Sequence, residues 1–467
     1  MQTFRNSRPA LCGLLLILFL CSARVLLAQP GSIDASFTPQ LNAGAQIYVV
    51  AIQPDGQILV GGQFDSIGNV PIANVARLNP DGSLDGTFNP SYAADQGFVT
   101  ALVMQSDGKI LVGGSFYSSY GLGPNNLVRL NPDGSVDNNF DYGLYLDGPV
   151  NAIAVQTDGG IVLAGGFAIV DGYLRRSVAR LHGDGTLDYG FDACVASSAG
   201  DGGTAVALQP DNRILATGNF TFTGNRVRNG IARLEICGDL DASYAPQPGV
   251  NVGGVAYAFS LLPNANLVLG GSFQNYYAEY MPGVSLLDTN GVPDTTFNPG
   301  IGIEQGSAIY VITRQADGKL LLGGNFTAFD GSSKPGITRL LANGRPDGSF
   351  NAGTGANNSI SAIAVQANKR ILVAGKFSTF AGQTKNGLVR LMGEPPPPGL
   401  DPPLLVGGGW TITLHGQSQS HYSIETSSNL SDWLPWTNFT STASSTTFSD
   451  TTATSARRRF YRAALLP

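Results

Sequence analysis

The sequence predicts an all-β fold, namely a seven-bladed β-propeller of four-stranded blades followed by a small β-sandwich. Three observations predict it. A segment of the type Pro-Asp-Gly-Gln-Ile-Leu-Val-Gly-Gly-Gln-Phe, first present at 54–64, recurs along the chain. Tight turns rich in Pro, Asp and Gly separate short apolar runs, which is typical of strands. The two ends of the repeat array complement each other, so the array can close into a ring.

The phenylalanine that ends each copy measures the period. Successive copies end 52, 51, 53, 53, 53 and 51 residues apart. A nearly fixed period filled with short strands and turns indicates a repeat fold. The closing residues are Phe64, Phe116, Phe167, Phe220, Phe273, Phe326 and Phe377.

Each repeat is expected to form four short strands in a fixed order. An apolar strand such as 150–156 comes first, and a Pro-Asp-Gly turn leads to the strand that ends in Gly-x-Phe. A variable loop leads to a third strand that ends in Arg-Leu, as at 77–78. The turn Asn-Pro-Asp-Gly at 79–82 then starts a fourth strand at 84–88. Pro pre-sets φ in such a turn and Gly accepts the left-handed conformation that follows.

A hairpin of this type places the arginine of the third strand opposite an aspartate of the fourth. An opposite-charge cross-strand pair contributes about 0.2–1 kcal/mol, so we interpret these residues as structural rather than catalytic. The fifth repeat departs from the pattern, because Leu286 replaces the arginine while Asp294 remains. The predicted pairs are Arg77–Asp85, Arg129–Asp137, Arg180–Asp188, Arg233–Asp241 and Arg339–Asp347.

The two ends of the array are expected to meet. Seven strands end in Gly-x-Phe, but only six fourth strands follow them, because the last repeat runs from 390–391 into proline-rich sequence. The missing piece is present at the other end, at 31–37. We therefore expect the N-terminal segment to complete the last blade, with Asp34 against Arg390. This closure would leave no open sheet edge.

At these residues the chain resembles the bacterial delta-sixty repeat β-propeller family. The family pattern includes Pro-Asp-Gly-Lys-Ile-Leu-Val-Gly-Gly-x-Phe and Arg-Leu-Asn-Pro-Asp-Gly-Ser-Leu-Asp, and 106–114 is among the best matches. The resemblance covers about residues 31–393. It implies a propeller in an exported bacterial protein and provides no active-site residues to transfer.

The N-terminal residues 1–28 are predicted to be a signal peptide. Arg5 and Arg8 precede an apolar stretch at 11–20 that is too short to span a bilayer. Cleavage is expected after Ala28, with Ala23 as the alternative. The protein is therefore expected to be secreted, extracellular or on the cell surface, with the periplasm as an alternative.

Further domains follow the signal peptide. We expect the propeller at 29–393, a Pro-rich linker at 394–402 and a small β-sandwich at 403–467. The last of these resembles the immunoglobulin- or fibronectin-like modules of secreted bacterial proteins. Cys194 and Cys237 are expected on opposite faces of the propeller, too far apart for a disulfide. We expect a monomer with two free thiols.

Composition excludes several classes of function. A net charge of −6 argues against a nucleic-acid partner, which requires a basic surface. No second apolar segment follows the signal peptide, so no membrane span is expected. The three histidines are scattered, and the sequence shows no metal cluster, nucleophile motif or phosphate loop. Accordingly, no metal, cofactor or catalytic residue is predicted.

Binding is the favoured function. The second-to-third and fourth-to-first connections vary and are expected on one face, where variable loops on a rigid scaffold usually carry function. Tyrosines there suit a sugar ring and arginines an acidic group, although ordinary loop packing would also account for them. The predicted ligand-binding residues are Tyr173, Arg175, Arg176, Arg226, Arg228, Tyr276, Tyr277 and Tyr280.

We expect a non-enzymatic propeller that binds a protein or a glycan through this variable-loop face. Two alternatives stay open. One is an exported hydrolase or lyase that acts on polysaccharide, since propellers host such enzymes. The other is a structural component of a surface assembly.

Overall fold

The structure is a computed structural model of the chain. It describes residues 29–90, 96–117, 125–141, 143–193, 195–196, 202–222, 228–244, 249–250, 253–277, 279–393, 399–406, 409–415, 421–441, 443, 445–451 and 459–465. The predicted signal peptide and the start of the linker lie outside these ranges. The described residues form strands and turns only, which confirms the all-β class. Within these ranges no helical segment has the length and apolar character needed to cross a membrane.

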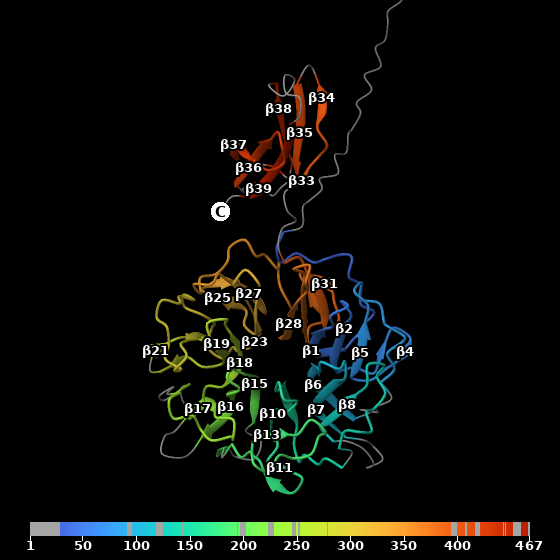
Figure 1. Ribbon diagram of the computed structural model, residues 1–467, viewed down its shortest axis with the longest axis vertical. Coiled ribbons are helices and arrows are strands. Elements are labelled where there is room, and N and C mark those ends of the chain that lie inside the picture. Colours follow the sequence, from blue (N-terminus) through green and yellow to red (C-terminus); the bar gives the residue numbers. More distant parts are fainter. Residues whose placement is uncertain are drawn as a thin grey trace, which may run out of the picture. The chain divides into compact units, whose positions relative to one another are not determined.

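Small antiparallel sheets of one topology repeat along the compact unit Ala28–Pro395. The described residues contain seven of them, arranged around a common centre (Figure 1). In each, the second strand lies between the first and the third. The first strands are β1 (Gln46–Ile52), β6 (Gln96–Met104), β9 (Val150–Val155), β15 (Gly203–Leu208), β18 (Ala256–Leu261), β23 (Ile309–Arg314) and β28 (Ile360–Val365).

The remaining strands of these sheets follow the same order. The second strands are β2 (Ile58–Gln63), β7 (Ile110–Tyr117), β10 (Ile161–Gly165), β16 (Ile214–Phe222), β19 (Leu267–Gly271), β24 (Leu320–Gly324) and β29 (Ile371–Gly375). The third strands are β5 (Val75–Leu78), β8 (Leu127–Leu130), β13 (Val178–Leu181), β17 (Arg228–Leu234), β22 (Val284–Leu287), β27 (Ile337–Leu340) and β32 (Leu388–Leu391). In the fourth repeat β14 (Val195–Ala196) also pairs with β16.

The core lies between neighbouring sheets. Strands such as β10, β24 and β29 are buried along their whole length, which explains their continuous apolar sequence. One cluster joins Leu59 of the first repeat to Val99 and Val112 of the second. The first glycine of each Gly-Gly pair permits this packing. A Cβ on Gly61 would lie 2.7 Å from a methyl group of Val99.

The predicted fourth strand is shorter than expected. It forms a single bridge in each repeat, such as Leu78 with Leu84, so the prediction of a full fourth strand is wrong. The cause is the next residue, Asp85, whose Oδ1 accepts hydrogen bonds from the backbone N–H (2.9 Å) and hydroxyl (2.7 Å) of Thr87. These bonds curl the chain into a turn, so the ladder cannot continue.

The predicted closure of the ring is confirmed. Ile33 forms an antiparallel bridge with Leu391. The backbone N–H of Asp34 donates to the carbonyl of Arg390 at 2.8 Å, and Arg390 Nε donates to Asp34 Oδ2 at 2.7 Å. The N-terminal segment thus takes the place that 84–88 has in the first repeat.

The arginine of each pair also reaches the next repeat. Arg77 Nε lies 2.6 Å from Asp85 Oδ2, as the sequence predicts, while its Nη1 donates to the carbonyl of Pro132 at 2.8 Å. Its guanidinium carbon lies 4.9 Å from the ring centroid of Phe88. We call this arrangement, in which one arginine joins an aspartate to a turn carbonyl of the following repeat, the arginine clasp.

Clasps recur around the ring, with one interruption. The last of them returns from Arg390 to Pro80 of the first repeat. Leu286 leaves the fifth repeat without a clasp to the sixth. The other turn carbonyls are those of Gly183 for Arg129, Ile236 for Arg180, Thr289 for Arg233 and Gly393 for Arg339.

The clasps predict a loss of stability in acid. Burial alone would raise the pKa of Asp85, but hydrogen bonds from Thr87 and Arg77 outweigh it and lower this pKa. The pKa values of Asp34 and Asp347 are lowered in the same way, each by its neighbouring serine and its arginine. A carboxylate with a lowered folded-state pKa stabilises the fold above its unfolded pKa of about 3.9, and this contribution disappears as the pH falls through the folded value.

We therefore expect the free energy of unfolding to fall steeply below about pH 4. Urea unfolding at pH 7, 5, 4 and 3 measures it. Equal stability at pH 7 and pH 3 would contradict the prediction.

The loops between second and third strands are more regular than the sequence suggests. In five repeats they form hairpins of two-residue strands, closed by turns with positive φ such as Asp171 (49°) and Gly172 (79°). The hairpins are β3–β4 (Ser66–Ile67, Val70–Pro71), β11–β12 (Ile169–Val170, Tyr173–Leu174), β20–β21 (Asn275–Tyr276, Glu279–Tyr280), β25–β26 (Ala328–Phe329, Ser332–Ser333) and β30–β31 (Thr379–Phe380, Gln383–Thr384).

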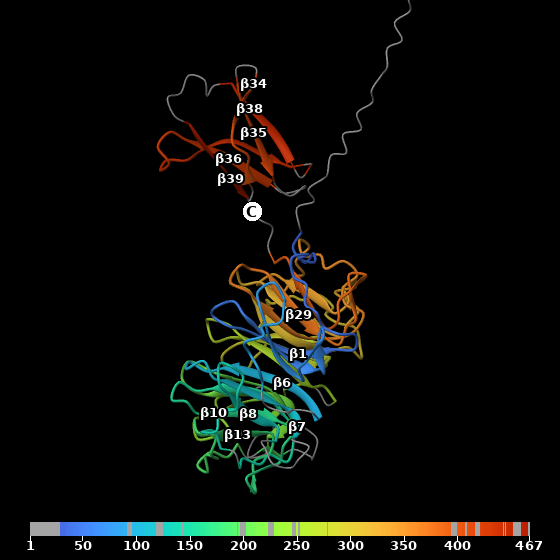
Figure 2. The same ribbon diagram turned by 90° about the vertical axis from the view of Figure 1, so that its right-hand side faces the viewer.

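The C-terminal residues form a separate compact unit that begins after Pro395. It contains two antiparallel sheets, β33-β35-β34 with β38 on β35, and β37-β36-β39 (Figure 2). Residues 399–400, assigned to the linker by the sequence, form strand β33 of this unit. The strands are β33 (Gly399–Leu400), β34 (Leu404–Val406), β35 (Gly409–His415), β36 (His421–Ser427), β37 (Leu434–Thr440), β38 (Ser445–Asp450) and β39 (Phe460–Leu465).

Candidate ligand-binding site

Every first strand contains a β-bulge near its beginning. In β1, Ile47 pairs with Gly62 and Val49 pairs with Gly61, so the register skips Tyr48. Bulges turn a side chain away from its regular direction and are frequent beside functional sites. The residues skipped in this way are Tyr48, Thr100, Asn151, Thr204, Tyr257, Tyr310 and Ser361.

The second glycine of the Gly-Gly pair makes room for the bulge. A Cβ on Gly62 would lie 2.0 Å from the carbonyl oxygen of Gln46, and a Cβ on Gly324 would lie 2.0 Å from that of Ala308. Contacts this short are impossible, so a side chain at these positions would displace the bulged backbone. The two glycines of a pair thus have different roles, one between repeats and one at the bulge.

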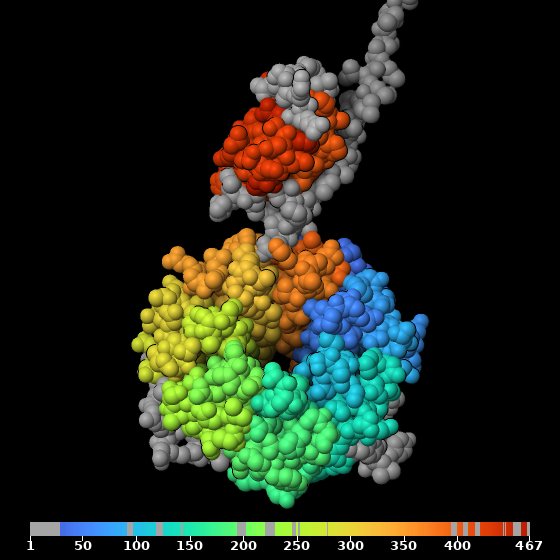
Figure 3. All heavy atoms as spheres, in the orientation of Figure 1, coloured from blue at the N-terminus to red at the C-terminus, as the bar shows by residue number. Residues whose placement is uncertain are grey.

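The bulged side chains meet at the centre of the ring in a cavity of about 360 Å³, which we call the axial pocket. Figure 3 shows the hollow at this centre. Its volume lies within the range of small-molecule sites. The lining residues are Tyr48, Phe98, Thr100, Asn151, Thr204, Tyr257, Tyr310, Ser361 and Lys376.

One side of the axial pocket is polar and held by hydrogen bonds between repeats. Thr100 Oγ1 donates to the carbonyl of Val150 at 2.8 Å, and Asn151 Nδ2 donates to that of Gly203 at 3.0 Å. Thr204 Oγ1 likewise donates to the next first strand at 2.6 Å. These bonds fix the side chains and leave their oxygen lone pairs to accept hydrogen bonds from a ligand.

The other side of the axial pocket is aromatic. The rings of Tyr257 and Tyr310 meet edge to face with centroids 5.2 Å apart, and those of Tyr48 and Phe98 do so at 5.6 Å. Lys376 Nζ lies 5.4 Å from the centroid of Tyr48. Burial raises the pKa of Tyr48, and burial together with Tyr257 raises the pKa of Tyr310. Both hydroxyls therefore stay protonated at neutral pH and act as hydrogen-bond donors, that of Tyr48 toward Gln46 Oε1.

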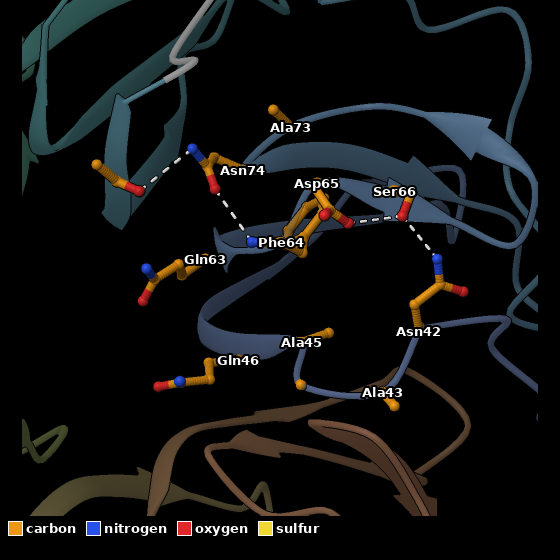
Figure 4. A pocket seen from close by; sticks show the side chains of 12 residues that line it. Asn42, Ala43, Ala45, Gln46, Gln63, Phe64, Asp65, Ser66, Ala73 and Asn74 are labelled. Carbon is orange, nitrogen blue, oxygen red and sulfur yellow. Dashed lines mark hydrogen bonds between the residues drawn. The ribbon is translucent and has the colours of Figure 1, made fainter.

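A second cavity of about 450 Å³ lies over the first repeat and is called here the first-repeat groove (Figure 4). Asn74 fixes one wall, because its Oδ1 accepts from the N–H of Phe64 (3.1 Å) and its Nδ2 donates to the carbonyl of Gly97 (3.3 Å). Across the groove, Ser66 Oγ donates to Asp65 Oδ1 at 2.6 Å. The lining residues are 42–46, 63–66, 73–74 and Gly97.

The predicted residues of the third repeat lie on and beside hairpin β11–β12. Tyr173 is half-exposed and meets Tyr189 edge to face at 4.9 Å. Arg176 is exposed. Arg175 is buried, and its guanidinium donates to the carbonyl of Tyr189 at 3.1 Å, so its expected role as a surface contact is wrong.

The predicted tyrosines of the fifth repeat differ in their surroundings. Tyr276 is fully buried and its hydroxyl donates to the carbonyl of Gly291 at 3.0 Å. It occupies the position that Phe329 has in the sixth repeat, so its prediction as a ligand contact is wrong. Tyr277 is half-buried in the hairpin turn with φ 55°. Tyr280 is exposed and lines a separate cavity of about 550 Å³ with Gln274, Ile301 and Glu304 among others.

The remaining predicted residues add little to a single site. Arg228 begins strand β17, and Arg226 lies outside the described residues. None of the eight predicted residues lines the axial pocket. Cys237 is exposed and Cys194 lies outside the described residues, so the two free thiols stay a prediction. In the described part of the chain, no group of three or more His, Cys, Asp or Glu side chains could hold a metal ion.

The sequence contains a signal for the axial pocket that was missed. Each bulged residue stands 16 positions before the phenylalanine that closes its repeat, as Tyr48 does before Phe64. This position always lies between small or apolar residues, yet its residue type varies among Tyr, Thr, Asn and Ser. A variable polar position at a fixed place in a repeat would have identified it.

Comparison with protein families agrees with the repeated sheets. The model described as "Domain of unknown function (DUF5122) beta-propeller" matches six segments, 53–88, 105–140, 156–191, 209–244, 315–350 and 366–393. These six segments are similar to a β-propeller repeat. The matched DUF5122 segments each begin at the end of a first strand. The fifth repeat, which has Leu286 in place of the arginine, is not among them.

Solved structures similar to this chain are distant. A gluconolactonase from Xanthomonas campestris is 13% identical with a TM-score of 0.36, over 77% of this chain and 98% of the other. Prolyl oligopeptidase B from Galerina marginata is 10% identical with a TM-score of 0.39, over 80% of this chain and 56% of the other. These values support no inference about function. A search of curated proteins found no match.

Proposed function

We propose that the chain is an exported, non-enzymatic propeller of seven DUF5122 blades, of the delta-sixty type, that binds a glycan at the axial pocket. The observation that supports it most is the meeting of seven bulged side chains of different chemistry in one cavity. In this proposal residues 1–28 direct export, the C-terminal unit is a small β-sandwich of immunoglobulin or fibronectin type, and the protein is a monomer at the cell surface or outside the cell.

The lining of the axial pocket suits a sugar. A pyranose ring has apolar faces and a hydroxyl-bearing edge, and the pocket has aromatic rings on one side and hydroxyl and amide groups on the other. Tyr257 and Tyr310 supply stacking surfaces with polar tips, while Thr100, Asn151 and Thr204 supply hydrogen-bonding oxygens. A protein partner would need roughly 800 Å² of buried surface on each side, which a central cavity of this size does not offer by itself.

The same lining favours binding over catalysis. Its side chains are hydroxyl, amide, aromatic and ammonium groups, which recognise a ligand by hydrogen bonds and stacking. Most glycosidases act through two carboxyl groups that flank the scissile bond. The hydrolase or lyase alternative therefore predicts turnover of a polysaccharide, and this can be measured directly.

The test is a glycan and protein array probed with the purified protein, followed by calorimetry on the best ligand. We expect binding to glycans, and we expect Tyr310→Ala to weaken it at least tenfold, about 1.4 kcal/mol, because a stacking surface at the centre of the site is lost. Tyr280→Ala, an exposed tyrosine outside the axial pocket, is the matched control.

Three results would overturn parts of the proposal. Wild-type affinity in a folded Tyr310→Ala protein would exclude the axial pocket as the site. Release of new reducing ends from a bound polysaccharide would support the enzyme alternative. Binding to proteins alone would shift the site to the exposed side chains of the outer hairpins, namely Tyr173, Arg176 and Tyr280.

A further inference from the structure

The axial pocket and the first-repeat groove are connected through one side chain. Tyr48 lines the axial pocket, and its hydroxyl donates to Gln46 Oε1 at 2.7 Å and lies 3.4 Å from Gln63 Oε1. Both glutamines line the first-repeat groove. The two cavities therefore share a polar wall, with the aromatic ring of Tyr48 on one side and the two amides on the other.

The hairpin beside the groove is held differently from the hairpins of the third and sixth repeats. At the position of Asn42, the third and sixth repeats have Asp147 and Glu304, whose carboxylates accept hydrogen bonds from backbone N–H groups of the neighbouring hairpin. Asn42 instead directs its Nδ2 to Ser66 Oγ (2.6 Å) and to the carbonyl of Gly68 (3.1 Å). Asn42 thus holds the hairpin of the first repeat through the side chain of Ser66 and the turn carbonyl of Gly68.

The chemistry of the groove is polar and weakly acidic. Gln63 and Asp65 are exposed, and Gln46 is half-buried. Amide groups both donate and accept hydrogen bonds, which suits sugar hydroxyls. The carboxylate of Asp65 accepts hydroxyl donors and repels anions. The exposed ammonium of Lys376, by contrast, belongs to the axial pocket.

We propose that this surface binds one end of a linear glycan, with the terminal unit in the axial pocket and the following, neutral units in the first-repeat groove. The proposal rests on the proposed function and adds to it a direction and a substrate class. The bound chain leaves the centre over the first repeat, because Tyr48 there connects the two cavities. Uronic acid units are disfavoured in the groove by Asp65.

The test is calorimetry of the full chain with oligomers of glucose, N-acetylglucosamine, xylose and galacturonic acid, two to six units long. We expect the affinity for a neutral series to rise about tenfold between two and four units. Gln63→Ala should abolish this rise, so that the variant binds four units no more tightly than two. Ser115→Ala, at the same position of the second repeat and outside both cavities, should behave like the wild type. Tyr310→Ala should weaken binding at every length.

The outcomes separate the two proposals. Affinity that does not depend on chain length, or an equal effect of Gln63→Ala on all lengths, overturns the groove while the axial pocket stands. A rise with length for galacturonate oligomers equal to that for neutral ones overturns the role of Asp65. Absence of binding by every oligomer overturns both proposals. Because Gln63 is exposed at the end of β2, its truncation should leave the melting temperature unchanged, which thermal unfolding verifies.

Discussion

Replacing Arg390 with alanine is expected to lower the free energy of unfolding by about 3–5 kcal/mol, as for other buried ion pairs that lose one partner. Arg390 and Asp34 are both buried. The guanidinium joins the N-terminal segment, the last sheet and the turn carbonyl of Pro80 in the first repeat. Arg370 lies 3.1 Å from Asp34 and remains in the variant, so we expect the lower end of this range.

Urea unfolding measures the loss, and hydrogen exchange locates it. We expect the amides of 31–37 to lose protection before those of the other repeats, because this segment is held to the last sheet by the clasp, a single bridge and a few backbone hydrogen bonds rather than by a full strand ladder. Arg176→Ala removes an exposed arginine and is the control. Unchanged protection of 31–37 in a destabilised Arg390→Ala protein would show that the clasp does not hold the closure.

Replacing Gly324 with alanine is expected to destabilise the fold by about 1–3 kcal/mol and to weaken ligand binding at the same time. The added Cβ would lie 2.0 Å from the carbonyl oxygen of Ala308, so the bulge that presents Tyr310 must shift. Such a coupled effect distinguishes a glycine that shapes the site from one that only serves packing.

The matched control is Gly348→Ala. A Cβ at Gly348 would meet nothing within 4 Å, so both stability and binding should be retained. Chemical unfolding and calorimetry of the two variants provide the comparison. If Gly324→Ala binds the array-selected glycan as the wild type does, the bulge does not position Tyr310 for the ligand.

The sequence predicts the arrangement of the sheets well, because the same pattern of strands and turns repeats along the chain. Turn chemistry and period locate the sheets, and the count of fourth strands identifies the contact between Asp34 and Arg390. The second partner of each arginine could not be predicted in this way. It is a backbone carbonyl of another repeat, as for Arg77 with Pro132. Every residue has a backbone carbonyl, so the residue type does not indicate which one accepts the hydrogen bond.

The site was predicted less well, because it depends more on the direction in which side chains point than on their residue types. Tyrosines in variable loops suggested a surface, yet Tyr276 anchors its hairpin from within. The bulged residues lie inside strands, where alternation would send Tyr48 and its equivalents to a sheet face. Only the skipped register turns them to the centre, and the sequence shows it indirectly, through the second glycine opposite each bulge.

The repeated bulge also allows the selectivity of the axial pocket to change while the shape of the backbone stays the same. Each repeat contributes one bulged side chain to the axial pocket. The glycine opposite the bulge keeps the backbone the same whichever residue type stands there. Recombination between repeats could therefore exchange a tyrosine for a threonine at the centre without disturbing the scaffold. Relatives with the same repeats could accordingly be grouped by the seven residue types at the bulges. In this chain they are, in chain order, Tyr, Thr, Asn, Thr, Tyr, Tyr and Ser. Chains with the same seven bulged residues should bind the same ligand even where their outer loops differ.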